Sequence, residues 1–230
     1  MGRREDNKRR KREALLEQGL AAFLGEGYDR ASIERIAEAA GVARGTFYLY
    51  FPDKLALFDA VMDEWFVPIL GVLDDTGAAL LAADGPAAAL EVYGGMATGL
   101  AIVGLAHRDA VEVALRESRR SGEAGASLRQ RELAMLERVT RFTDLALERG
   151  LIHTTAPRLV GLVVFGAVER LFYEVICGTD LGDPTAAAQE VLRLFATALG
   201  MADALDQPDE SASNAPAAST RTASRSSSSS

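Results

Sequence analysis

Apolar residues recur at helical spacing along most of the chain, and no long segment alternates apolar and polar residues as a half-buried strand does. The first predicted helix covers residues 9–25, and its apolar face consists of Leu16, Leu20, Phe23 and Leu24. Gly25 and Gly27 end this helix, because glycine readily adopts the left-handed turn that follows a helix. The pattern therefore predicts an all-α protein.

Residues 32–51 predict two short helices joined by a tight turn. Ser32 is a candidate N-cap for a helix that stops at Gly41, with Val42 as a buried anchor at the corner. A second helix follows over 43–50, and Pro52 ends it by forcing the preceding residue out of helical geometry. This arrangement is a helix-turn-helix.

The next helix begins near Pro52 and has an apolar face that ends at Trp65, which we expect to pack between two domains. Pro68 is expected to bend or end it. Beyond it, the pattern predicts helices near 86–105, 108–120, 127–149, 157–177 and 184–200, about nine in all. We divide the chain into an N-terminal helical domain at 9–67, a larger helical domain at 68–204, and a Ser-rich tail at 205–230 that we expect to be disordered.

The formal net charge of −8 at first argues against a nucleic-acid partner. The charge is unevenly distributed, however. Residues 1–54 hold 11 Lys and Arg against 9 Asp and Glu, whereas the remainder holds 14 against 24. The predicted helix-turn-helix therefore lies in a mildly positive region, and the acidic surplus lies outside it.

Several function classes lack the residues they need. A single cysteine, Cys177, excludes an intrachain disulfide, and we interpret it as an inert buried thiol at a helix end. Two histidines and no catalytic ordering of Ser, His and Asp argue against a metal centre, a cofactor and an enzyme. No stretch has about 18 uninterrupted apolar residues, and no apolar secretory segment follows the charged start, so we expect no membrane partner and a cytoplasmic location.

The helix at 43–50 has the chemistry of a major-groove reader. Arg44 is suited to donate two hydrogen bonds to guanine, and small Ala43 and Gly45 let the backbone approach the bases. Candidates for phosphate contacts are Thr46, Tyr48, Tyr50 and Lys54. Glu34 lies near the same face, where it either accepts a hydrogen bond from cytosine or points to solvent.

The run GVARGTFYLYFPDKLALF, residues 41–58, closely resembles the DNA-binding domain of the tetracycline-repressor-like (TetR/AcrR) regulators. The matching features are the Gly41-Val42 turn, Arg44, Thr46, the aromatic residues between 47 and 51, and Lys54. Ile36-Ala37, Ala40 and the Phe23…Gly27-Tyr28 helix ending also match, so the resemblance covers about 9–67.

The resemblance implies a homodimer that binds a palindromic operator, usually represses, and leaves the DNA when a small-molecule inducer enters the larger domain. It implies base contacts by Arg44, Gly45 and Tyr48, and phosphate contacts by Ser32, Thr46, Tyr50 and Lys54, with Phe47 packed inward. Two alternatives stay open: a constitutive DNA-binding regulator without ligand release, and a helical enzyme.

The cationic run Lys8–Arg12 suits either a solvated helix start or phosphate contacts. Its position beside a recognition helix favours phosphate contacts, and we assign them to Arg9 and Arg12.

The larger domain offers less specific signals. The resemblance implies a dimer interface on the helices at 157–177 and 184–200, with candidate residues Phe165, Phe172, Val191, Leu194 and Phe195. The helix at 157–177 carries apolar residues on more than one face, so we expect it to be buried on two sides. The Gly-rich apolar segment at 90–105 leaves room for a largely apolar ligand, whose candidate contacts are Met96, Leu100, His107, Phe142, Phe165 and Tyr173.

Overall fold

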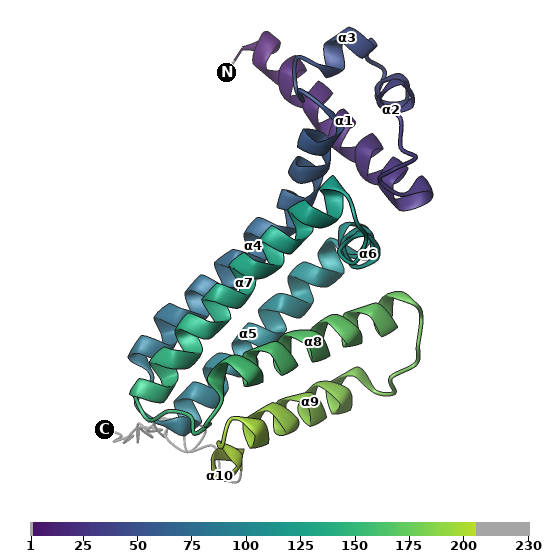
Figure 1. Cartoon of the computed structure of the whole chain (residues 1–230). Coiled ribbons are helices and arrows are strands. Elements are labelled where there is room, and N and C mark those ends of the chain that lie inside the picture. The colour runs from purple at the N-terminus through teal and green to yellow at the C-terminus, as the bar shows by residue number, and fades with distance from the viewer. Residues whose placement is uncertain (1, 206–230) are drawn as a thin grey trace, which may run out of the picture.

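The computed structural model describes residues 2–205, apart from side chains at 184, 185, 187–189, 204 and 205. Within this part of the chain every regular element is a helix (Figure 1). The helices are α1 (Arg3–Glu26), α2 (Ile33–Ala39), α3 (Arg44–Phe47), α4 (Lys54–Ala82), α5 (Pro86–Ala106), α6 (Arg108–Glu117), α7 (Glu123–Glu148), α8 (Pro157–Ile176), α9 (Pro184–Ala198) and the single turn α10 (Ala202–Leu205). The predicted all-α class is confirmed, whereas the tail at 206–230 lies outside the described residues.

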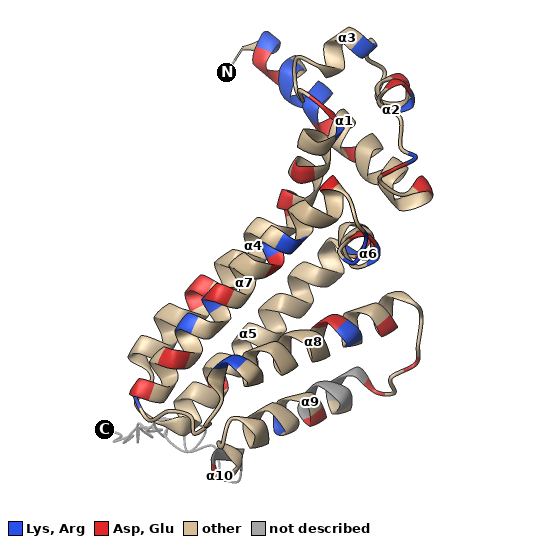
Figure 2. Ribbon diagram, viewed as in Figure 1, with Lys and Arg blue, Asp and Glu red and all other residues tan. Residues whose placement is uncertain are grey.

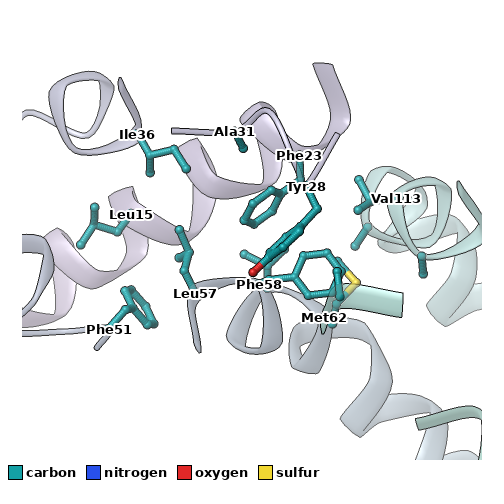
Figure 3. Packing of buried hydrophobic residues seen from close by; sticks show 14 of the residues in the cluster. Leu15, Phe23, Tyr28, Ala31, Ile36, Phe51, Leu57, Phe58, Met62 and Val113 are labelled. Carbon is teal, nitrogen blue, oxygen red and sulfur yellow. The ribbon is translucent and has the colours of Figure 1, made fainter. Parts of the chain in front are cut away.

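The helices α1 to α3, the start of α4 and side chains of α6 and α7 share one core that is rich in aromatic residues (Figure 3). The ring centroids of Phe23 and Phe58 lie 5.3 Å apart, and those of Tyr28 and Phe58 lie 5.1 Å apart, both edge to face. Such pairs stabilise a core beyond the area they bury, typically by about 0.5–1.5 kcal/mol each. This core holds the two short helices on the outside of α1.

The buried stripe of α1 differs from the predicted one. Leu15, Gly19 and Phe23 are fully buried, whereas Leu16, Leu20 and Leu24 are only partly buried at its edge. Gly19 explains the shift, because a Cβ at this position would lie 2.9 Å from Leu57 Cδ2. The missing side chain lets α4 approach α1 closely, and a pattern of apolar residues does not reveal this.

Pro68 was predicted to bend or end this helix; α4 continues through Pro68 to Ala82, so the second of these two outcomes is wrong. A proline costs an internal hydrogen bond, but packing on both sides of the break is able to maintain the helix. Trp65 lies at this point and packs against both hydrophobic cores, as predicted. The proposed boundary at 67/68 therefore falls inside one continuous helix that serves both units.

The larger unit is built on α4, α5 and α7, which lie side by side along their length (Figure 1). Its core includes Leu73, Leu80, Tyr93, Phe142 and Ala146. The helix α5 is long and apolar enough to span a membrane by length and composition, with a mean hydropathy of 1.5 over 18 residues. Only 22% of that window is buried in the single chain.

The helix α8 is much less covered than predicted. Every residue of α8 is described, and Gly161 alone is buried. Leu159, Leu162 and Val163 are 60%, 46% and 61% exposed. The expectation of burial on two sides therefore fails for a single chain, because α8 packs against α6, α7 and, through Phe172, α5, while the face with Leu159, Leu162 and Val163 stays exposed. Cys177, at the end of α8, is exposed, so its interpretation as a buried thiol is also wrong.

Candidate nucleic-acid interface

The helices α2 and α3 meet at a turn whose geometry the sequence predicts. The Ser32 side chain accepts a hydrogen bond from the Arg35 N–H at 3.5 Å, as an N-cap does. Gly41 follows α2 with a φ of +67°, a left-handed conformation that favours glycine. The turn is closed by the Val42 N–H, which donates to the Ala37 carbonyl at 2.9 Å. Ile36 and Phe47 then anchor the two helices in the core.

Burial of Phe47 turns the other side of α3 outward. Arg44, Gly45 and Tyr48 are exposed, while Ser32, Thr46 and Tyr50 are partly buried beside them. The regular helix is shorter than predicted, since α3 ends at Phe47 and residues 48–50 form a turn. Leu49, 79% exposed, was not among the predicted residues. Its place next to Tyr48 makes it a candidate for apolar contact with a thymine methyl group.

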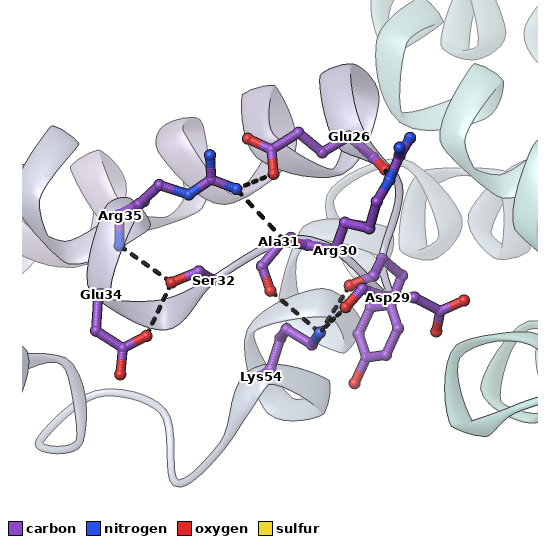
Figure 4. Close-up of polar contacts among 9 residues, drawn as sticks. Glu26, Asp29, Arg30, Ala31, Ser32, Glu34, Arg35 and Lys54 are labelled. Carbon is purple, nitrogen blue, oxygen red and sulfur yellow. Dashed lines mark hydrogen bonds and ion pairs between the residues drawn. The ribbon is translucent and has the colours of Figure 1, made fainter.

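Lys54 occupies a different environment from the one predicted for a phosphate contact (Figure 4). Its ammonium donates to the carbonyls of Tyr28, Asp29 and Ala31 at 2.7, 3.2 and 3.1 Å. It also lies 4.4 Å from the centroid of the Tyr28 ring. An ammonium has three protons, so a phosphate contact would require one of these bonds to break. Lys54 thus ties the start of α4 to the loop before α2.

Replacing Lys54 with methionine tests this structural role. We expect a loss of about 1–3 kcal/mol in the free energy of unfolding, because the bonds that it makes are charge-assisted and the loop carbonyls lose their partner. Urea unfolding followed by circular dichroism measures the loss. If Lys54 served only phosphate, the variant would unfold like the wild type and lose only DNA affinity.

The cationic run on α1 lies at the same end of the unit as α3 (Figure 2). Lys8 and Arg10 are exposed. Arg9 pairs with Asp6 and Glu13 at 3.2 and 3.5 Å, and the Arg12 guanidinium lies 5.6 Å from the Phe51 ring centroid. Arg9 and Arg12 also line a cavity of about 660 Å³ between α1, α4 and the α5–α6 junction. Their assignment to phosphate stays a prediction.

Deletion of residues 1–12 should weaken binding to every DNA sequence and reduce its salt dependence. Each lost phosphate contact lowers the slope of log K against log salt by about 0.9. Binding to the same duplex at several salt concentrations measures this slope. An unchanged slope would show that these cations do not reach the phosphates.

Glu34 and Arg44 form an ion pair of 3.0 Å between α2 and α3. The prediction offered cytosine or solvent for Glu34, and in the free protein the carboxylate instead contacts the arginine assigned to base reading. Both side chains are more than half exposed. Each charge stabilises the ionised form of the other. Hydrogen bonds from the backbone and from Ser32, together with the charge of Arg44, lower the pKa of Glu34. The contact with Tyr48 and the charge of Glu34 raise the pKa of Arg44.

Comparison with known proteins places this domain in a family. Residues 15–61 match the family model described as bacterial regulatory proteins, tetR family. Over 54 residues the chain is 43% identical to the HTH-type transcriptional regulator YvdT of Bacillus subtilis, and over 60 residues it is 37% identical to the repressor Rv1474c of Mycobacterium tuberculosis. Residues 15–61 therefore form a TetR-family DNA-binding domain. These matches cover 24% and 26% of this chain and 28% and 32% of the relatives.

The fold of the whole chain also has solved counterparts. The fatty acid degradation regulator FadR of Bacillus halodurans superimposes with a TM-score of 0.65 at 21% identity, covering 80% of this chain and 94% of that one. FadR of Bacillus subtilis, solved with stearoyl-CoA, gives 0.62 at 18%, covering 81% and 98%. At such identities the likeness extends to the fold alone.

The six residues predicted for the ligand pocket do not all gather in one place. Phe142 is buried against Tyr93, and Met96, Leu100 and Phe165 pack at the edge of the same core. His107 lines the cavity near α1, and Tyr173 is 41% exposed beside Arg170. Tyr93 is buried, and its hydroxyl has no hydrogen-bond partner among the described residues; this burial raises its pKa to about 12. Tyr93, Met96, Leu100, Phe142 and Phe165 therefore belong to one region of the core, from which His107 and Tyr173 are absent.

The residues predicted for the dimer interface divide into two groups. Phe172 faces inward, since its ring packs directly over Gly104 of α5, and Phe165 is partly buried in the core. Leu194 is 60% exposed, while Val191 and Phe195 are partly buried. Exposed Leu159, Leu162 and Val163, which the prediction did not include, form an outward face of α8.

The DNA-binding domain is joined to the larger unit through α6 and α7. The Tyr28 N–H donates to Glu117 Oε1 at 3.3 Å, and the Tyr28 hydroxyl donates to Glu123. Burial and the bond with Glu123 raise the pKa of the Tyr28 hydroxyl. Arg120 pairs with Glu117 at 3.1 Å and with Asp29 at 3.0 Å. The Glu117 side chain is 5% exposed. A shift of α6 would therefore move the contacts that hold the end of α1.

Proposed function

We propose that this TetR-family regulator is a homodimeric repressor that binds a palindromic operator through α3. The observation that carries the proposal is the inward anchor of Phe47, which leaves Arg44, Gly45 and Tyr48 together on an exposed face. A recognition helix enters the major groove with its N-terminal residues, and Arg44 is the first residue of α3. Repressor names among the relatives support the direction of control.

Dimerisation is proposed through α8 and α9. Leu159, Leu162 and Val163 place apolar surface in solvent along one side of α8, and Leu194 does so on α9. Contiguous exposed apolar surface is typical of an interface. A two-fold dimer would present two recognition helices to two half-sites, which is why a palindromic operator follows.

Release by a small, largely apolar molecule completes the proposal. The region around Tyr93, Phe142 and Met96 is apolar and contains one unpaired hydroxyl, which suits a ligand with an acceptor group. The structures of fatty acid regulators among its neighbours support this class of ligand. A ligand that shifts α6 would act on α1 through Glu117 and Arg120.

The test combines footprinting with sedimentation. Purified protein is incubated with DNA upstream of its own gene and of the adjacent genes, and we expect a protected palindrome. Sedimentation should give a dimer, and a native mass spectrum should show any retained ligand. Protection that no apolar candidate ligand relieves would favour a constitutive regulator instead, and the lack of any protected site would contradict the proposal.

A further inference from the structure

The ion pair between Glu34 and Arg44 lies on the surface that faces the DNA in the proposed complex. Arg44 is 61% exposed and Glu34 is 54% exposed, so the pair does not contribute to the buried core. Exposed pairs of this kind usually contribute little to stability. Glu34 lies in the first turn of α2, where a negative charge interacts favourably with the helix N-terminus. The contact with Arg44 is separate from that local role, because it joins α2 to another helix.

Glu34 is held in place from both sides of its carboxylate. Its Oε1 contacts Arg44 Nη1 at 3.0 Å, and the Ser32 hydroxyl donates to its Oε2 at 2.8 Å. Ser32 is itself fixed as the N-cap of α2 (Figure 4). The chain of contacts thus runs from the start of α2, through Glu34, to the arginine of α3.

The ion pair leaves Arg44 able to contact a base. A guanidinium carries five N–H donors in a rigid fork, and the contact with Glu34 occupies one nitrogen. Two parallel donors are enough for guanine O6 and N7. An arginine side chain has large rotamer freedom, so a contact that restrains it before binding reduces the entropy lost on reaching the base.

We propose that Glu34 is a positioning residue that sets the base preference of Arg44, a role that rests on the proposed operator binding. The carboxylate keeps the guanidinium directed at one base-pair position and disfavours its swing to a neighbouring phosphate. The same negative charge lowers affinity for DNA of any sequence. Glu34 thus increases specificity at a cost in general affinity.

The experiment compares Glu34→Gln with a matched control, Glu38→Gln. Glu38 lies one turn further along α2, is exposed, and has no ion pair within residues 2–205. Both variants remove one negative charge from the same helix. For each, dissociation constants are measured for the operator, for operators substituted at each base pair, and for unrelated DNA, with circular dichroism as the check of folding.

For Glu34→Gln, we expect discrimination at one base-pair position to fall by about five- to tenfold, a part of what a bidentate contact supplies. Glu38→Gln should keep the wild-type discrimination at every position. In an Arg44→Ala background, the substitution at Glu34 should no longer change discrimination, because the effect acts through the arginine.

Two results would overturn the inference. If Glu34→Gln and Glu38→Gln change affinity equally at all positions, Glu34 is only a surface charge. If Glu34→Gln improves discrimination, the carboxylate competes with the base for Arg44. Wild-type protein that binds no operator would contradict the proposed function itself, which separates the two failures.

Discussion

Replacing Arg44 with alanine is expected to lower operator affinity by about 30- to 10,000-fold. A bidentate contact with guanine provides about 1–3 kcal/mol of discrimination, and a symmetric dimer makes the contact in both half-sites. At 1.4 kcal/mol for each factor of ten, two contacts account for that range. Arg44 is 61% exposed, so its removal should leave folding and dimerisation intact.

The measurement is fluorescence anisotropy with the operator and with a scrambled duplex. Affinity for the scrambled duplex should fall only slightly, because Arg44 is one cation among several near the DNA. Arg141→Ala is the matched control: this arginine is 69% exposed on α7 and pairs with Glu137 four residues earlier. An unchanged ratio of operator to scrambled affinity in Arg44→Ala would refute the assignment of Arg44 to the groove.

The helix-turn-helix was predictable because short-range rules determine it. Gly41 has the left-handed conformation that the turn needs, Ser32 caps α2, and Phe47 is fully buried. Each of these features depends on residues within a few positions in the chain. The same holds for the helices of the larger unit, whose observed ends lie close to the glycines and prolines that predicted them.

Features that depend on distant residues were not predictable in this way. Lys54 reads as a surface cation, and only the folded loop at 28–31 brings three carbonyls to its ammonium. The partner of Glu34 depends on the angle between α2 and α3. The uncovered face of α8 was not predictable either, because an apolar sequence does not distinguish burial in a core from burial against a second chain.

The acidic residues of the chain are concentrated away from the proposed DNA-binding surface. Acidic residues are frequent along α4 and α7, and several are paired with arginine (Figure 2). Arg131 contacts Asp59 and Asp63 at 3.0 and 2.6 Å, and Arg138 contacts Asp74 at 2.9 Å. These pairs join α7 to α4. The acidic surplus therefore lies along the body of the molecule and away from α3.

A second large effect is expected from Val163→Asp, which places a carboxylate on the exposed face of α8. Val163 is 61% exposed, so the single chain should fold normally. In a two-fold dimer the new charge would be buried near its own copy, at a high cost in free energy. We expect a monomer in sedimentation. Losing the second half-site should lower operator affinity by about 100- to 10,000-fold, the range that linked binding sites provide.

Leu133→Asp is the matched control, because Leu133 is 58% exposed on α7 and its substitution introduces the same charge on a different helix. It should stay dimeric and bind the operator like the wild type. If Val163→Asp also remains a dimer with full operator affinity, α8 is not at the interface. If it dissociates but keeps its operator affinity, each protomer binds DNA independently, and the requirement for a palindrome no longer holds. The two readouts together therefore test the interface and its function separately.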